Sequence, residues 1–215
     1  MCRHRASAYS EIMIKSPVNP IVIAVGASAG GIPALTRVLQ DLPPGFPCSV
    51  LIVQHLQPAH TSRLAEVLSK RCRMPVRDAQ DGEVIEAGII YIAQPDLHLV
   101  ASDDGLLHLL SSNKVNRMRP SVDTLFKSVA IHYGRRAVAV ILTGSGRDGA
   151  AGLAAIKLAG GTTIAQDPDL SQFRWMPKAA VATGCVDYIL PLGSIGLELE
   201  RIEANLSVNA DKHER

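Results

Sequence analysis

The order of apolar and polar residues along the chain alternates between two patterns. Runs dominated by apolar residues occupy positions 21–25, 49–55 and 136–143, and such runs predict strands that are buried on both faces of a parallel sheet. After the first run, apolar residues recur at helical spacing from residue 35 to residue 42, and the Pro-Pro-Gly of residues 43–45 ends this helix. The pattern therefore predicts repeated strand–helix units and an α/β fold.

The same pattern predicts the remaining elements. Helices are expected at residues 61–70, beginning at Thr61 or Ser62, and at 124–132, 151–159 and 193–206, with a strand at 162–166 and a helix and strand within 177–192. Between residues 76 and 110, short alternating runs separated by Gly-containing turns predict short strands and hairpins, including strands at 89–92 and 98–100. His98 and His108 fall in this region, where alternation favours a position on a strand face over a catalytic role.

Composition limits the number of domains and the class of protein. A chain of 215 residues with 47% hydrophobic and 20% charged residues is long enough for one good-sized core and short for two. We expect a flexible lead-in at residues 1–19, one domain at 20–206 and a polar tail at 207–215. The net charge of +2 gives no broad basic field, which argues against nucleic-acid binding.

The spacing of the cysteines and the lengths of the apolar runs indicate the cellular compartment. The four cysteines lie far apart, without the spacing of a zinc site or a dense disulfide framework, so reduced and mostly buried thiols are expected. The basic N-terminus lacks the continuous apolar segment of a signal peptide, and no run approaches the roughly 20 residues of a membrane span. The sequence therefore predicts a cytoplasmic protein without direct membrane insertion.

The turn after the first buried run carries the first candidate for chemistry. Ser28 is the central residue of Gly26-x-Ser28-x-Gly30, a spacing that raises a serine hydroxyl above a parallel sheet beside the free N–H groups of a helix start. Those N–H groups could hold an oxyanion. The same small residues also suit a phosphate-binding or degenerate dinucleotide-binding loop, so this motif alone leaves both interpretations open.

Two further polar residues follow the other buried strands. His55 ends the second run, and Asp148 follows the third run in a Gly-rich turn. Each has a structural alternative, as a strand-capping histidine and as a helix N-cap. Because the carboxyl ends of parallel strands share one sheet edge, the three residues together supply the nucleophile, base and orienting carboxylate of a serine hydrolase. The order Ser28, His55, Asp148 differs from that of α/β-hydrolases.

The loop before the helix at 124–132 contains two arginines. Arg117 and Arg119 could bind an acidic substrate segment near the active edge, although solvated arginines are common.

Four separate motifs, in the right order, resemble the chemotaxis protein-glutamate methylesterase family, CheB. They are Gly-Ala-Ser-Ala-Gly-Gly at residues 26–31, Val-Gln-His at 53–55, Asn-Arg-Met-Arg-Pro-Ser-Val-Asp at 116–123 and the segment 141–152 with Thr-Gly-Ser-Gly-Arg-Asp-Gly. Residues 165–167 and 176–180 add to the match, which runs from about Ile21 to Leu192. This resemblance implies an α/β fold with a doubly wound, mostly parallel sheet that is flanked by helices, and with a few short antiparallel strands.

The resemblance also implies an activity. Family members hydrolyse glutamate γ-methyl esters on the cytoplasmic helices of methylated chemoreceptors and release methanol, and they can deamidate receptor glutamines. By resemblance, Ser28 is the nucleophile, His55 the general base and then acid, and Asp148 the residue that holds the imidazole. Backbone N–H groups near the Ser28 and Ser145 turns would stabilise the oxyanion, and no metal or organic cofactor is needed.

The chain departs from the family pattern at several positions. Ala29 replaces the threonine that commonly follows the nucleophile, Ser145 replaces a methionine, and Trp175 replaces a glycine before Met-Pro. The 20 residues before Ile21 cannot encode the N-terminal receiver domain of the best-known members. The chain is therefore expected to be either a stand-alone esterase, controlled by a separate regulatory protein, or a fragment, with Met1 arguing mildly against the fragment.

Two alternatives to an esterase fit parts of the sequence. A catalytically silent module that docks on chemoreceptors or signalling partners would have no need of Ser28, His55 and Asp148 together. A nucleotide-binding protein would place an acidic residue at the end of the second strand to bind a ribose, and His55 occupies that place. The esterase is the interpretation that the sequence favours.

Overall fold

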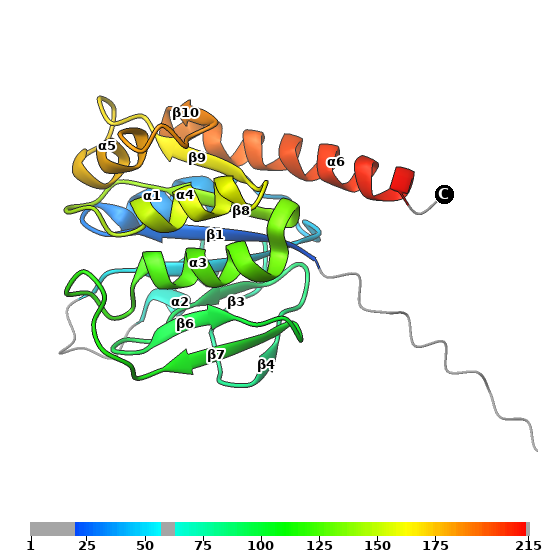
Figure 1. Cartoon of the computed structure of the whole chain (residues 1–215), viewed down its shortest axis with the longest axis horizontal. Coiled ribbons are helices and arrows are strands. Elements are labelled where there is room, and N and C mark those ends of the chain that lie inside the picture. Colours follow the sequence, from blue (N-terminus) through cyan, green and yellow to red (C-terminus); the bar gives the residue numbers. More distant parts are fainter. Residues whose placement is uncertain (1–19, 57–62, 214–215) are drawn as a thin grey trace, which may run out of the picture.

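A seven-stranded sheet forms the centre of the computed structural model, which describes residues 20–56 and 63–213 (Figure 1). Its strand order is β10-β9-β8-β1-β2-β5-β3, and every neighbouring pair is parallel. The strands are β1 (Ile21–Ala27), β2 (Cys48–Gln54), β3 (Val76–Asp78), β5 (Ile90–Ile92), β8 (Ala137–Ile141), β9 (Thr162–Gln166) and β10 (Tyr188–Leu190). The predicted α/β fold with a doubly wound, mostly parallel sheet is confirmed.

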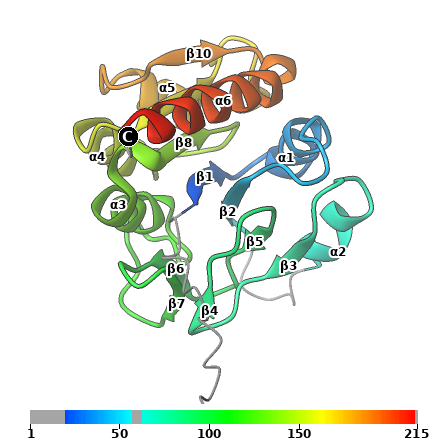
Figure 2. The ribbon, with the colours of Figure 1, turned by 90° about the vertical axis from the view of Figure 1, so that its right-hand side faces the viewer.

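Helices cover both faces of this sheet (Figure 2). One face packs against α1 (Gly31–Leu39), α2 (Leu64–Ser69) and α6 (Ile195–His213), and the other against α3 (Val122–Tyr133), α4 (Ala150–Leu158) and α5 (Trp175–Val181). The alternation of side chains along β1 explains this division, because Ile23 and Val25 belong to the first core and Val22 and Ala24 to the second. Such two-sided burial accounts for the uninterrupted apolar run in the sequence.

The region 76–110 divides between two sheets. As predicted, it contains short strands and a hairpin: β4 (Glu83–Val84), β6 (His98–Ala101) and β7 (Leu106–Leu110) form a small antiparallel sheet in the order β4-β7-β6. The prediction of short strands and hairpins did not indicate that β5 and β3 extend the main sheet in parallel. Parallel neighbours need not be close in sequence, so local turn signals could not indicate this pairing.

The topology concentrates three strand ends at one edge. β1 pairs with β2 on one side and with β8 on the other, and the chain builds the sheet outward from β1 in both directions. Open α/β sheets bind ligands beyond the carboxyl ends of the strands at such a reversal. A site is therefore expected at the residues that follow β1, β2 and β8.

Two helices have boundaries that differ from those predicted. The last helix continues beyond residue 206 to His213, so most of the predicted polar tail belongs to α6. The helix expected at 61–70 is α2, which begins at Leu64, and the proposed caps Thr61 and Ser62 lie outside the described residues. Within the described ranges, none of the helices has the length and apolar character needed to cross a membrane.

Candidate active site

Ser28 lies in the turn between β1 and α1. Gly30 precedes α1 with a φ of 71°, a left-handed conformation that a residue with a Cβ rarely adopts, and it lets the chain turn directly from strand to helix. The Ser28 N–H donates to the Thr143 carbonyl (3.1 Å), and the Gln54 amide donates to the Ser28 carbonyl (2.8 Å). Neighbouring strand ends thus fix the backbone of Ser28 from both sides.

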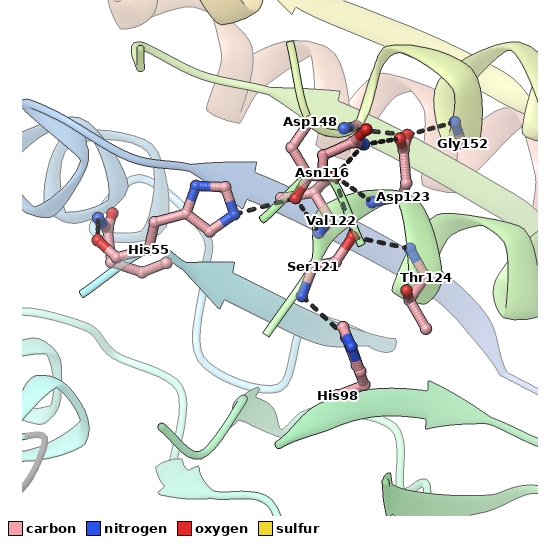
Figure 3. Close-up of polar contacts among 11 residues, drawn as sticks. His55, His98, Asn116, Ser121, Val122, Asp123, Thr124, Asp148 and Gly152 are labelled. Atoms are coloured by element: carbon pink, nitrogen blue, oxygen red, sulfur yellow. Dashed lines mark hydrogen bonds and ion pairs between the residues drawn. The ribbon is translucent and has the colours of Figure 1, made fainter. Parts of the chain in front are cut away.

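His55 and Asp148 come into direct contact although 93 positions separate them in the sequence. His55 Nε2 lies 3.0 Å from Asp148 Oδ2, and the two side chains are only 5% and 3% exposed (Figure 3). The His55 backbone is held to β1 by a 3.0 Å hydrogen bond to the Ala27 carbonyl. With Nε2 facing the carboxylate, Nδ1 is the ring nitrogen that remains for another partner.

The carboxylate of Asp148 accepts hydrogen bonds from the start of α3 as well. Its donors include the Val122 N–H (2.7 Å), the Ser121 hydroxyl (2.9 Å) and the Asn116 amide (3.2 Å). Burial disfavours the charged form, but the hydrogen bonds from His55, Val122 and Asn116 outweigh it, so the pKa of Asp148 is lowered. Asp148 is therefore held as a carboxylate that can orient an imidazole.

Asp148 does not cap α4, the helix that follows it, although the sequence alone is compatible with such a cap. Its carboxylate instead meets the N-terminus of α3, which approaches β1 closely because Gly26 has no side chain. A Cβ at Gly26 would lie 2.3 Å from Val122 Cγ1. Anionic groups are favoured at helix N-termini, so this packing stabilises the ionised carboxylate.

Ser28 and His55 line one cavity of about 770 Å³. Its other lining residues are Ala29, Gly30, Gly31, Ile32, Pro33, Gln54, Leu56, Lys114, Arg117, Met118 and Arg119. Three of these residues carry a positive charge and none is acidic. The cavity therefore suits an uncharged reacting group that is flanked by negative charge.

Arg117 and Arg119 both line the cavity, but their side chains make different contacts. The Arg119 guanidinium is engaged with the Asp96 carboxylate (2.9 Å) and with the carbonyls of Ser111 and Ser112. Arg117 is exposed, and its side chain forms no hydrogen bond or ion pair with any other described residue. Arg117 can therefore offer its charge to a ligand, while Arg119 shapes the loop that presents it.

The backbone at Arg117 has an unusual conformation. Asn116 and Arg117 both have positive φ, 51° and 67°, in a two-residue turn closed by hydrogen bonds between Val115 and Met118. This is the geometry of a type I′ turn, in which Asn is favoured at the first position and Gly is usual at the second. An arginine at the second position is therefore a local backbone strain at the edge of the cavity.

Both predicted oxyanion turns offer a backbone N–H group. In the described part of the chain, neither the Ala29 N–H nor the Ser145 N–H donates to a protein group, whereas the N–H groups of Ser28 and Gly144 are taken by the carbonyls of Thr143 and Phe173. Ser145 is exposed and is not among the described residues that line the cavity, but the residue before it reaches the nucleophile turn, since a Cβ at Gly144 would lie 2.9 Å from Ser28 Cβ. The N–H groups of Ala29 and Ser145 thus both remain candidate oxyanion donors.

Trp175, which departs from the family pattern, lies at the start of α5. Its side chain is largely exposed, with the Lys178 ammonium 5.8 Å from the ring centroid. The preceding residues reach the nucleophile turn, since a Cβ at Gly30 would lie 2.6 Å from the Gln172 Oε1.

The described residues do not favour a cysteine nucleophile or a metal site. Burial raises the pKa of the Cys48 thiol and raises that of Cys72 to about 11, so both remain protonated and unreactive. Among residues 20–56 and 63–213, His, Cys, Asp and Glu side chains form no group of three that could hold a metal ion.

A comparison with models of protein families shows the family to which the chain belongs. The model of the CheB methylesterase family matches residues 23–199, which include the turn of Ser28, His55 and Asp148. The chain belongs to the CheB methylesterase family. The family predicted from the four sequence motifs is therefore confirmed.

Individual relatives and a solved structure agree with the family. The chain is 43% identical over 192 residues to protein-glutamate methylesterase/protein-glutamine glutaminase 1 of Bordetella avium, covering 89% of this chain and 56% of the relative. Its identity to the corresponding Anaeromyxobacter dehalogenans protein 2 is 45% over 181 residues, covering 84% and 53%. The CheB methylesterase catalytic domain of Thermotoga maritima superposes with a TM-score of 0.82 at 36% identity, covering 86% of this chain and 100% of that domain. The chain spans about half the length of the curated relatives it matches.

Several polar residues around the site were not assigned roles from the sequence. Gln54 fixes the turns of Ser28 and His55, and its only sequence signal is an amide at the end of an apolar strand. His98 is fully buried, as a strand-face position predicts, and its Nδ1 accepts the Ser121 N–H at 3.2 Å. Asp123 accepts the N–H groups at the start of α4. These three residues support the backbone around Ser28, His55 and Asp148 through hydrogen bonds.

Proposed function

We propose that this chain hydrolyses glutamate γ-methyl esters on methyl-accepting chemoreceptors and releases methanol. The observation that carries the proposal is the buried His55–Asp148 pair beside the cavity that Ser28 lines. The relatives named protein-glutamate methylesterase support the same reaction. The substrate would be a helix of the receptor's cytoplasmic part, which places the reaction in the cytoplasm. The separate regulatory protein expected from the sequence stays a prediction.

In the proposed reaction, His55 Nδ1 takes the Ser28 proton as Oγ attacks the ester carbonyl carbon. The Ala29 N–H would stabilise the oxyanion of the tetrahedral intermediate, which collapses as His55 returns the proton to the methoxide leaving group. Methanol leaves, and a glutamyl ester on Ser28 remains. Water, activated by His55, then attacks this ester and frees the glutamate carboxylate. The same steps on a glutamine carboxamide would release ammonia, in keeping with the glutaminase in the relatives' names.

The proposal is tested by mixing the purified chain with methyl-labelled cytoplasmic fragments of several receptors and measuring labelled methanol. We expect release that is proportional to enzyme concentration and leaves a free carboxylate on the receptor. Binding of the fragments without methanol release from any of them would contradict the esterase and favour a silent docking module.

Removal of the Arg117 charge is expected to weaken substrate binding. The variant Arg117→Gly deletes the guanidinium while suiting the positive φ of 67° at this position. A lost charge-assisted contact of about 1.5 kcal/mol raises KM for an acidic receptor segment roughly tenfold. The rate constant kcat should stay near that of the wild type, because in the described part of the chain the Arg117 side chain makes no hydrogen bond or ion pair with His55 or Asp148.

The salt dependence of KM provides a second readout for Arg117. Raising the ionic strength should increase the wild-type KM more than that of Arg117→Gly, because salt screens exposed charges. Arg135→Ala is the matched control, since Arg135 is also exposed but lies before β8, away from the cavity lining. Equal KM values and equal salt slopes for Arg117→Gly and wild type would show that this arginine does not contact substrate.

A further inference from the structure

A second buried carboxylate lies next to Asp148. Asp123, in the first turn of α3, is 4% exposed and does not line the Ser28 cavity in the described part of the chain. Its Oδ1 accepts the N–H groups of Gly149 (3.0 Å) and Gly152 (2.7 Å) at the start of α4. A buried carboxylate at this place thus caps the helix that directly follows Asp148.

The two carboxylates cap each other's helices. Asp148 precedes α4 but accepts the Val122 and Asp123 N–H groups at the start of α3, at 2.7 and 3.3 Å. Asp123 lies in α3 but accepts the N–H groups at the start of α4. This exchange links the two helix starts, so the position of Asp148 depends on both helices (Figure 3).

One amide group connects the two carboxylates. Asn116 Nδ2 donates to Asp123 Oδ2 at 2.7 Å and to Asp148 Oδ1 at 3.2 Å. Two neighbouring carboxylates repel each other, and a shared donor between them offsets that repulsion. The short bond to Asp123 also fixes the amide in the direction that Asp148 needs.

We infer that Asp123 is a positioning residue for the proposed reaction: it holds Asp148, through α4 and Asn116, at the distance that orients the His55 imidazole. The inference rests on the proposed function of the triad. In the described part of the chain, Asp123 neither lines the Ser28 cavity nor contacts His55, so it would act on the rate of the chemical step and leave substrate binding unchanged. A displacement of about 1 Å at a catalytic group can cost roughly 10²-fold in rate.

The variant Asp123→Asn tests this inference with little change of volume. Its remaining oxygen can still accept from Gly149 and Gly152, but its NH₂ group would oppose the Asn116 NH₂ group. We expect kcat for methanol release to fall about 10- to 100-fold with KM within twofold of wild type. In the ¹H NMR spectrum, the downfield signal of the proton between His55 and Asp148 should shift or disappear.

Two further variants separate positioning from folding. Asn116→Gly removes only the shared amide, on an exposed turn whose φ of 51° glycine adopts readily, and it should show the same NMR change and a smaller loss of kcat. Asp187→Asn is the matched control, because Asp187 also accepts a backbone N–H, from Thr163 at 3.0 Å, but lies before β10, outside the site. It should lower the melting temperature without changing kcat or the NMR signal.

The outcomes distinguish this inference from the proposed function. The NMR signal needs no substrate, so it tests the positioning of His55 and Asp148 even if wild-type protein releases no methanol. Wild-type kcat and an unchanged signal in Asp123→Asn would overturn the role of Asp123 while leaving the esterase intact. A rise in KM alone in both Asp123→Asn and Asn116→Gly would also overturn it.

Discussion

The variant Ser28→Ala is expected to release methanol about 10⁵- to 10⁶-fold more slowly than wild type. Without the hydroxyl no acyl-enzyme forms, and His55 and Asp148 have no nucleophile to activate, so the whole triad is lost at once. The residual rate would come from oxyanion stabilisation and substrate binding alone. Because Ser28 lies on a turn fixed through its backbone by Thr143 and Gln54, the variant should fold and still bind receptor fragments.

A serine-directed fluorophosphonate gives a test of Ser28 that does not depend on finding the right receptor. Wild-type protein should gain the mass of one reagent at Ser28, and Ser28→Ala should gain none. Ser69→Ala is the matched control, since Ser69 is an exposed serine in α2 whose hydroxyl, among the described residues, bonds to the Glu66 carbonyl alone. Methanol release by Ser28→Ala within tenfold of wild type would exclude Ser28 as the nucleophile.

The sequence predicted the elements that bring the site together because each lies at the end of a buried strand. Apolar runs long enough to be buried on both faces identify β1, β2 and β8, and the polar residue after each run stands out against that background. The rule that parallel strands share a carboxyl edge then places Ser28, His55 and Asp148 near one another. The family motifs in the same turns pointed to the same three residues.

The supporting contacts could not be predicted in this way, because they join residues that no local pattern relates. Asp123 caps a helix that starts 27 positions later in the chain, at Ala150, and Arg119 pairs with Asp96 across a loop. An Asp in the first turn of a helix normally indicates a cap for its own helix. Likewise, short runs with Gly-containing turns indicate hairpins, and only the tertiary fold shows that β3 and β5 join the parallel sheet.

The variant Asp148→Asn is expected to lower kcat about 10⁴-fold. The carboxylate oxygens face five donors, three at Oδ1 and two at Oδ2, which are His55 Nε2 and the Val122 N–H. If the asparagine oxygen keeps the Oδ1 contacts, its NH₂ group faces His55 Nε2. The imidazole would then carry its proton on Nδ1, the wrong tautomer to accept the proton of Ser28.

Stability as a function of pH separates the orienting role of Asp148 from its contribution to the fold. The folded-state pKa of Asp148 is lowered, so its stabilisation is fully present above the unfolded-state pKa of about 4 and is lost as the pH falls through the folded-state value. Asp148→Asn should therefore be less stable than wild type at pH 7, with the difference shrinking below about pH 4. Denaturant unfolding at both pH values measures this difference. A variant with wild-type kcat at pH 7 would show that His55 does not need this carboxylate, whatever its stability.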